Sequence, residues 1–585
     1  MQTKPRLGAY FLVFVICLVA DLWFLRSALF HSDVRAPAAD IGHSAPYGHE
    51  VTPRPERCAN KTLTDWSFSI HSWQRLAREA YEQGGLPLWN DRAGCGQPLI
   101  GNLQAEVFSP YLPLNLAFGD QYIDWKQLAQ MIVAQLGSLW LIWVLRLSPL
   151  AALMAAISFS FGSYMQTWAV HPVSGSAAFA PGILASFLLL RNRFCATTVF
   201  GGGLLIALSI FAGHIESTFM ACMAACGVGL LVSSEDQTQV GFLSRVLFVP
   251  RALLVGLVGL GLAACQVFPF LDYLDQSLVM TIRDAAPRIP IPSEQFFAIF
   301  DPKAFGFPTD DGGFVGEGNY IETTIHVGRV ALVMAVVGLV QGVWRRQRLI
   351  VPLFVLAVFG TSLAFAPASV HDLLTFFPFN VMPLLRMHFL GSMLLPILAA
   401  FGVEAIVSSQ KSKSTLTLAI AVLLTGIYVA FGLWHEGQVD PQTTLLLLFS
   451  GIAVIVTRRF CTKNPEAIAA TLLIAVALIE AQLLWQPFVP MGPVSFLSPT
   501  SKAISYVEDQ PGNLRLFPSV SQLVPELGNL HNITSLRTYD GMGMTRPTAL
   551  YFHQKAFLGV STHAPIFRVN PETLDMLSVG WTLTN

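Results

Sequence analysis

The sequence predicts an all-α membrane protein with about thirteen spanning helices, two large outer loops and a small mixed α/β segment at its C-terminal end. Hydrophobic residues make up 53% of the 585 residues and charged residues only 12%, and the mean hydropathy is +0.55. Soluble domains are about 25% charged. Because apolar runs recur along nearly the whole chain, we expect one large membrane domain. The net charge of -1 indicates no nucleic-acid partner.

Apolar runs of roughly 17 to 25 residues are long enough to cross a bilayer. The first run follows Lys4 and Arg6. It is too long for the core of a signal peptide and lacks a small-residue cleavage site, so we interpret it as an uncleaved span. The expected spans are 8–29, 127–145, 150–169, 174–190, 197–213, 217–233, 252–270, 327–343, 349–367, 387–407, 415–434, 443–457 and 466–485.

Basic residues occur in alternate connections between these runs, which predicts the orientation. The short connections near His171, His214 and Glu436 hold essentially no Lys or Arg. A cytoplasmic N-terminus and an extracytoplasmic C-terminus follow from this pattern. The connections expected inside hold Lys4, Arg6, Arg146, Arg191, Arg193, Arg245, Arg251, Arg345, Arg346, Arg348, Lys411, Lys413, Arg458, Arg459 and Lys463.

The same orientation divides the chain into a membrane domain, 1–486, and an extracytoplasmic segment, 487–585. Its outer loops include 30–126, 271–326 and 368–386, which are rich in Pro, Gly, Trp and acidic residues. We therefore expect the chemistry outside. The chain stops just as a strand-like stretch, Leu574 to Leu583, begins, so the outer segment looks truncated or short.

The first outer loop contains an amphipathic helical pattern, which predicts a helix in the membrane interface. A helix packed on the protein's own spans explains the pattern equally well. Apolar residues at three- and four-residue steps are Trp66, Ile70, Trp73, Leu76, Ala77 and Ala80, and the other face holds Gln74, Arg75, Arg78 and Glu79.

A series of short motifs follows this helix. The first is Gly84-Gly85-Leu86-Pro87-Leu88-Trp89-Asn90, followed by Gly94-Cys95-Gly96-Gln97-Pro98-Leu99, Asn102, Gln104 and Phe108-Ser109-Pro110-Tyr111. Later motifs are His171-Pro172, Gly213-His214-Ile215-Glu216, Gly318-Asn319-Tyr320-Ile321-Glu322 with Gly328, Leu384-Leu385-Arg386 and Arg537-Thr538-Tyr539-Asp540. In this order the motifs resemble the YfhO family of bacterial membrane proteins. An insertion from about His31 to Thr64 departs from the family pattern.

The resemblance implies a GT-C type glycosyltransferase in the bacterial inner membrane. Such an enzyme takes a sugar from a polyprenyl-phosphate carrier at the outer face and transfers it to a cell-envelope glycan or lipid. The family pattern also implies that Trp89, Asn90, Gln104, Asn319 and Tyr320 contribute to substrate binding. Glu322 belongs to the same motif. No Gly-rich phosphate loop is evident, which is consistent with a lipid-linked donor.

Sugar transfer to a hydroxyl requires a base for the nucleophile and a cation for the phosphate leaving group. Asp65 stands where the family's acidic residue is expected, and Asp33 is the second candidate base. Arg386 is the sole basic residue in an outer connection between two apolar stretches, which suits a phosphate ligand or a headgroup anchor. Arg329, at the outer start of another span, has the same two interpretations.

Several other polar residues have either a structural or a functional interpretation. His214 and Glu216 occupy a tight outer turn, where they are either part of the site or tolerated structural groups. Asp21, inside the first span, is either a helix-packing partner or a deep site residue. Asp310, Asp311, Glu317 and Glu322 could hold a divalent cation or be solvated loop carboxylates. No other cofactor is indicated.

Two cysteines, Cys58 and Cys95, lie in the first outer loop, where they form a disulfide or remain two free thiols. The competing functions are a secondary transporter or lipid flippase and a non-catalytic scaffold for envelope assembly. Transporters tend to carry charged residues at mid-membrane depth. Here the polar residues concentrate in outer loops and at outer helix ends, which favours an interfacial enzyme.

Overall fold

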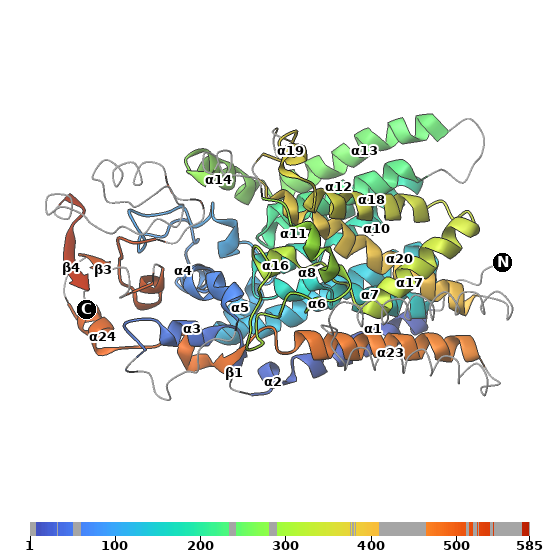
Figure 1. Cartoon of the computed structure of the whole chain (residues 1–585). Coiled ribbons are helices and arrows are strands. Elements are labelled where there is room, and N and C mark those ends of the chain that lie inside the picture. Colours follow the sequence, from blue (N-terminus) through green and yellow to red (C-terminus); the bar gives the residue numbers. More distant parts are fainter. Residues whose placement is uncertain are drawn as a thin grey trace.

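A computed structural model of the chain shows a mostly helical protein whose helical bundle continues into a smaller, mixed region at one end (Figure 1). It describes residues 7–31, 33–48, 50, 60–232, 241–279, 289–374, 376, 379–380, 382–408, 464–510, 514–518, 523–524, 526–538, 542, 544 and 576–583.

Within these residues, six helical segments are long and apolar enough to cross a membrane. They are Leu7–Phe24 (α1), Leu112–Val144 (α5, Leu112–Phe118, with α6, Tyr122–Val144), Pro172–Asn192 (α9, Pro172–Ala177, with α10, Ala180–Asn192), Arg245–Leu262 (in α13, Gly241–Leu262), Leu384–Val407 (η6, Leu384–His388, with α20, Phe389–Val407) and Pro465–Trp485 (α23). Shorter apolar helices are α7 (Pro149–Ser160), α11 (Ala196–Phe211), α12 (Ile215–Leu231), α17 (Arg329–Trp344) and α18 (Ile350–Ala364).

These helices coincide with most of the expected spans, which confirms a polytopic helical membrane domain. The expected spans 415–434 and 443–457 lie outside the described residues. The count of thirteen is therefore not confirmed.

The expected spans 8–29, 150–169, 174–190 and 252–270 are each interrupted in the structure. The run 150–169 ends as a helix at Ser160 because Gly162 adopts an extended backbone before the short helix α8 (Ser163–Thr167). The run 252–270 is divided at Ala263 into α13 and α14 (Ala264–Asp275). Hydropathy averaged over a window measures apolar length and does not register an interruption of one or two residues.

The bundle has a tightly packed centre and a more exposed periphery. Most of the segment Pro172–Asn192 and of α20 is buried, whereas α1 and α13 expose most of their side chains. Small residues allow α17 and α20 to approach closely: a Cβ atom on Gly338 or Gly402 would overlap the backbone of the facing helix. Close contact through small residues is typical of membrane helices.

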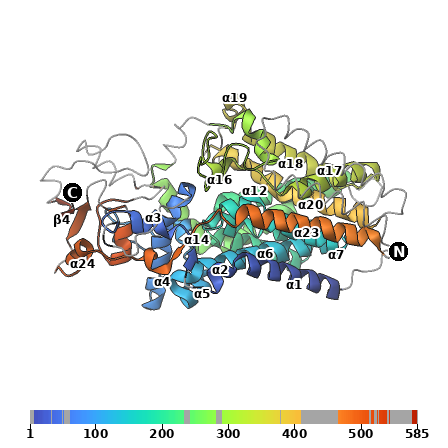
Figure 2. The same cartoon turned by 60° about the horizontal axis from the view of Figure 1, so that its bottom comes forward.

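The first outer loop and the C-terminal segment together form the mixed region. Strand β1 (Asp33–Arg35) pairs antiparallel with β2 (Met491–Pro493). Arg35, the last residue of β1, donates from its guanidinium to the carbonyl of Trp485 at 2.8 Å. Both views show the elements of this region beyond one end of the bundle (Figure 2). The short helix α2 (Arg26–Leu29) precedes this region, whose other elements include α3 (Ala38–His43), η1 (Lys61–Leu63), η4 (Gly119–Gln121), η7 (Val494–Leu497) and α24 (Lys502–Glu508).

The amphipathic helix is confirmed as α4 (His71–Glu82), preceded by one turn of π-helix, η2 (Trp66–Ile70). Its apolar face is buried, but the opposite face is also covered: the amide of Asn115 donates to the carbonyl of Gln74 at 3.0 Å. Arg78 pairs with Asp120 at 2.8 Å. This geometry favours a helix packed on the protein's own chain over a helix lying in the membrane interface.

The strand expected near residue 580 is also present. β4 (Val579–Leu583) pairs in parallel with β3 (Arg515–Pro518). Between these two strands in the chain, η8 (Leu527–His531) packs against α4. The described part of the C-terminal segment is therefore mixed in secondary structure, as the sequence predicts.

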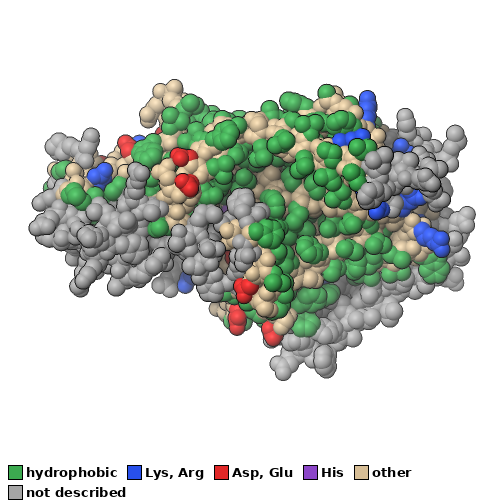
Figure 3. Space-filling view, turned by 90° about the horizontal axis from the view of Figure 1, so that it is seen from above, with side chains coloured by type: hydrophobic (Ala, Val, Ile, Leu, Met, Phe, Trp, Pro, Cys, Tyr) green, Lys and Arg blue, Asp and Glu red, His purple; other side chains and the backbone are tan. Residues whose placement is uncertain are grey.

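Side chains are distributed along the long axis as expected for a membrane protein. Figure 3 shows hydrophobic side chains over the middle of the molecule, several Lys and Arg near the end opposite the mixed region and a few near that region, and acidic side chains from the middle toward the mixed region. The exposed basic residues include Arg193, Arg245, Arg345, Arg346 and Arg348.

We predict that the first outer loop and the C-terminal segment lie on the same, extracytoplasmic side, because β1 and β2 pair directly. Cysteines introduced at Gln83 and Tyr506, both exposed, should react with a membrane-impermeant maleimide in intact cells.

Arg193→Cys provides the matched control, because Arg193 is exposed at the basic end. It should be labelled only after the membrane is permeabilised, and each variant is compared with the parent chain to subtract the native thiols. Protection of Gln83→Cys or Tyr506→Cys in intact cells would contradict the topology.

Candidate active site

A cavity of about 640 Å³ opens beside the end of α11 and the starts of α12 and η6. Its wall is mostly apolar where α11 to α14 contribute, and it becomes polar near the loop containing η3 (Leu103–Ala105) and at the start of α12. Apolar residues of the wall include Ile206, Ile210, Phe219, Leu260, Leu271 and Leu274, and its polar residues include Asn102, Gln104, His214, Glu216 and Arg386.

Arg386 is the centre of the polar end. Its Nη1 donates to Glu216 Oε2 at 2.8 Å. Its Nε donates to Glu322 Oε1 at 3.2 Å, and Nη2 donates to the same oxygen. The guanidinium also lies 5.3 Å from the centre of the Trp168 ring. Arg386 thus connects η6 to the start of α12 and to α16 (Tyr320–Thr323).

His214 completes this cluster and has a defined tautomer. Its Nδ1 accepts the backbone N–H of Ser217 at 3.2 Å as the N-cap of α12. An amide N–H only donates, so Nδ1 carries no proton and Nε2 carries the ring proton. Nε2 lies 3.4 Å from Glu216 Oε2 and 3.4 Å from Arg386 Nη1. Neutral His214 therefore presents a donor to Glu216.

Gly213 allows the loop around η3 to approach His214. Its φ is +102°, and a Cβ atom there would lie 2.8 Å from the carbonyl oxygen of Leu103 and 2.8 Å from the ring of Pro172. Beneath this contact, Lys126 pairs with Glu106 at 2.6 Å, and both side chains are buried. Gly213 thus allows the close packing of Leu103 and Pro172 at the cavity wall, and the buried Lys126–Glu106 ion pair lies next to this contact.

Asp65 interacts electrostatically with this region through His171. Burial is the main reason why the pKa of the His171 ring lies below its usual value. The carboxylate of Asp65 acts against this lowering, whereas Lys126 and Arg386 act with it. The exposed side chain of Asp65 is thus near enough to affect a histidine that also responds to the Arg386 cluster, although Asp65 does not line the cavity described above.

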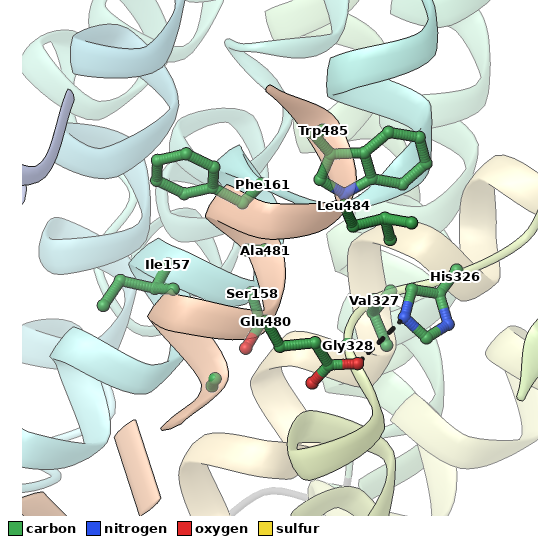
Figure 4. Close-up of a pocket in the computed structure, with 11 residues that line it drawn as sticks. Ile157, Ser158, Phe161, His326, Val327, Gly328, Glu480, Ala481, Leu484 and Trp485 are labelled. Carbon is green, nitrogen blue, oxygen red and sulfur yellow. Dashed lines mark ion pairs between the residues drawn. The ribbon is translucent and has the colours of Figure 1, made fainter. Parts of the chain in front are cut away.

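Arg329 belongs to a second, similar cluster. Its Nη1 lies 3.2 Å from Glu480 Oε1, and its Nη2 lies 2.8 Å from Asp301 Oδ1. Its backbone N–H also donates to Glu480 at 3.0 Å. His326 Nε2 lies 3.4 Å from the same carboxylate, and Figure 4 shows these two side chains pointing toward each other. Each cluster therefore combines one arginine, two carboxylates and one histidine.

The two clusters differ in access. Side chains of Arg329 and Glu480 are each 4% exposed, and the adjoining pocket of about 10 Å³ has room for about one water molecule. The side chains of Arg386 and Glu216 are 15% and 17% exposed and line the large cavity. This contrast favours a structural role for Arg329 and leaves Arg386 as the cation that a ligand can reach.

Other expected site residues lie elsewhere or have local partners. Asp33 lies opposite Pro493 in the β1–β2 pair. Asn90 forms a bridge with Gln97, and Trp89 covers Gly96. Asp33, Trp89 and Asn90 do not line the cavity, whereas Gln104 does.

The Gly-Asn-Tyr-Ile-Glu motif does not line the cavity, but it positions Glu322 next to Arg386. Asn319 caps α16 by accepting the backbone N–H of Ile321 at 3.3 Å. Tyr320 is buried and donates to the carbonyl of Pro302 at 3.1 Å. Glu322, one turn later, reaches Arg386.

No group of three or more His, Cys, Asp and Glu side chains among the described residues is arranged to hold a metal ion. Of the suggested cation ligands, Asp310 faces Lys303 at 3.5 Å and Glu322 faces Arg386. Cys58 lies outside the described residues, so its pairing with Cys95 remains a prediction, as does any metal requirement.

Sequence reasoning missed the carboxylates that neutralise Arg329. Glu480 is an isolated charge in an apolar run, and such a charge usually has a partner. Its presence therefore signalled a buried ion pair. Its partner, however, lies 151 positions earlier, and nothing in a single sequence identifies that pairing.

No family model matches the chain, and no curated protein matches it. Solved structures similar to it include the arabinofuranosyltransferase AftD from Mycobacteria, with 11% identity, a TM-score of 0.44, and coverage of 95% of this chain and 34% of that one. The archaeal oligosaccharyltransferase AglB from Archaeoglobus fulgidus, in complex with an inhibitory peptide and a dolichol-phosphate, has 12% identity, a TM-score of 0.42, and coverage of 91% and 65%.

ArnT from Cupriavidus metallidurans, bound to undecaprenyl phosphate, has 9% identity and a TM-score of 0.40, with 81% of this chain and 84% of that one covered. The chain thus spans about a third of the length of AftD and just under two thirds of that of AglB. TM-scores at this level do not establish a shared fold.

We predict that Arg329→Met destabilises the protein more than Arg386→Met. The first change leaves the buried carboxylates of Glu480 and Asp301 without their cation, which costs about 3–5 kcal/mol. The second leaves Glu216 and Glu322 beside the cavity, where their 17% and 23% exposure gives them access to water. Thermal unfolding of the purified variants measures the difference. Equal losses of stability would contradict the division into a sealed and an open cluster.

Proposed function

We propose that the protein is a membrane glycosyltransferase that transfers a sugar from a polyprenyl-phosphate carrier to a cell-envelope glycan or lipid. The reaction would take place at the extracytoplasmic face of the bacterial inner membrane. The cavity is the observation that carries the proposal, because its apolar wall leads to a polar end that contains Arg386. An anionic head group on an isoprenoid chain has this same division between polar and apolar parts.

In this proposal Arg386 binds the phosphate, because arginine keeps its charge and offers several N–H donors in one plane. Asp65 is the proposed general base that takes the proton of the acceptor hydroxyl. Its electrostatic effect on His171, which also responds to Arg386, supports this assignment. Glu216 is the second candidate base, since it lines the cavity.

A transporter or flippase is the second candidate function, and one observation favours it. Asp21 is fully buried inside α1, and its carboxyl group accepts from Gln135 Nε2 at 2.8 Å. Ionisable residues within the membrane often mark transport paths.

We predict that Asp65→Asn removes most sugar transfer without unfolding the protein, because the substitution preserves size and removes only the proton acceptor; a general base typically contributes about 10²–10⁴-fold. Arg386→Lys should also lose activity, since an ammonium group keeps the charge but not the planar set of donors. The assay supplies purified protein with a panel of polyprenyl-phosphate sugars.

Asp33→Asn is the matched control. Loss of activity in this variant, with Asp65→Asn unaffected, would mean that the wrong carboxylate had been assigned as the base. Normal rates in all three variants would move the site to His214 and Glu216. If the wild-type protein transfers no sugar but moves a solute or lipid across vesicles, the transporter proposal replaces this one.

A further inference from the structure

The loop around η3 forms one side of the polar end of the cavity. Asn102 and Gln104 both line it, beside His214 and Arg386. The side chain of Asn102 is used within the loop, because its Oδ1 accepts the backbone N–H of Gln104 at 3.0 Å. Gln104 itself is exposed. Its side chain is therefore the part of this loop that is best placed to contact a polar ligand.

The chain turns into the protein directly after η3, at Glu106. The φ of Glu106 is +55°, a left-handed conformation that a residue other than glycine keeps only when the surrounding structure holds it. Its Oε1 lies 2.6 Å from Lys126 Nζ, and the two side chains are 5% and 0% exposed. Lys126 belongs to α6, which packs against α7 and α10 in the bundle. The ion pair thus attaches an irregular loop to a well-packed helix.

The opposite side of the loop contacts the residue that precedes His214. A Cβ atom on Gly213 would lie 2.8 Å from the carbonyl oxygen of Leu103 and 3.1 Å from Cγ of Glu106. The loop is therefore fixed on two sides: close packing limits its approach to α12, and the ion pair limits its movement away from α6. Gln104, two residues before Glu106, takes its position from both constraints.

The chemistry of Gln104 differs from that of Arg386. An amide side chain offers a donor and an acceptor, which suits a hydroxyl group because a hydroxyl both donates and accepts. A phosphate oxygen accepts hydrogen bonds, and a guanidinium meets that need with several donors. The polar end of the cavity thus has one group suited to a sugar hydroxyl and one suited to a phosphate.

Resting on the function proposed above, we propose that the Lys126–Glu106 ion pair positions Gln104 to bind a hydroxyl of the donor's sugar while Arg386 binds its phosphate. Lys126 and Glu106 are then positioning residues, which act on the substrate only through the η3 loop. Loss of the ion pair should weaken the binding of the sugar and spare the binding of the phosphate.

The test compares two ligands on the full chain in nanodiscs by isothermal titration calorimetry. One is the polyprenyl-phosphate sugar that supports transfer, and the other is polyprenyl phosphate without a sugar. Each variant is compared with the parent chain for each ligand separately. A loosened protein binds both ligands more weakly, whereas a misplaced Gln104 affects only the ligand that carries the sugar.

The main variant removes both charges, Lys126→Met together with Glu106→Gln. Lys126→Met alone leaves a buried carboxylate without the cation that it faces, which is strongly destabilising, whereas replacing both partners of a buried pair is often nearly neutral. The double variant should bind the sugar-bearing ligand about threefold to tenfold more weakly, the value of one or two hydrogen bonds. Its affinity for the sugar-free carrier should be unchanged.

Gln104→Ala leaves the buried ion pair intact, so it tests the contact without touching the interior. It should cause the same selective loss of affinity. Adding Gln104→Ala to the double variant should cause no further loss, because the same contact is already absent.

Glu480→Gln is the matched control, because it disrupts another buried pair of an arginine and a carboxylate, which does not line the cavity. It should lower the thermal stability of the protein and change the affinity for the two ligands by the same factor, if at all.

Normal binding of the sugar-bearing ligand by the double variant or by Gln104→Ala would overturn the inference. An equal loss of affinity for both ligands in the double variant would also overturn it, since that result indicates general loosening. In both cases the proposed function stands if the parent chain transfers sugar. A parent chain that binds neither ligand and transfers no sugar would overturn both proposals.

Discussion

The contact between Arg386 and its two carboxylates is the constraint on which the candidate active site depends. It joins three segments that are far apart in sequence, at the start of α12, in α16 and in η6. The segments lie at the start of α12, before α17 and before α20, so the ion pairs fix these helix ends relative to one another. Because the guanidinium is also on the cavity wall, the same atoms that hold the helix ends are available to a ligand.

The second cluster, around Arg329, shows why residue type alone does not reveal function. Both arginines lie near the start of a helix, and each is close to two carboxylates and a histidine. Burial makes the difference. A sealed ion pair is costly to disturb and serves as a connection between α17 and α23, whereas a partly hydrated one can exchange partners. Similar chemistry is thus used once for structure and once, by our proposal, for binding.

The sequence was most informative about the membrane domain, because spanning helices must be both apolar and of a set length. It also identified Arg386, since an isolated cation between apolar stretches is conspicuous. It could not pair that residue with Glu322 and Glu216, which lie 64 and 170 positions away. The helix breaks near Gly162 and Ala263 were missed because hydropathy averaged over a window does not register an interruption of one or two residues. The roles of Asp65 and Asp33 remain predictions, because proximity does not identify a base.

The pairing of β1 with β2 has a consequence for biogenesis. Arg35 contacts Trp485, 450 positions later in the chain, and the ribosome adds about 5–20 residues per second. The N-terminal outer loop must therefore wait roughly 20–90 s after its own synthesis before its partner strand exists. During that interval its strand edge and the inner face of α4 lack their cover. The mixed region can therefore be completed only after α23 and β2 have been synthesised.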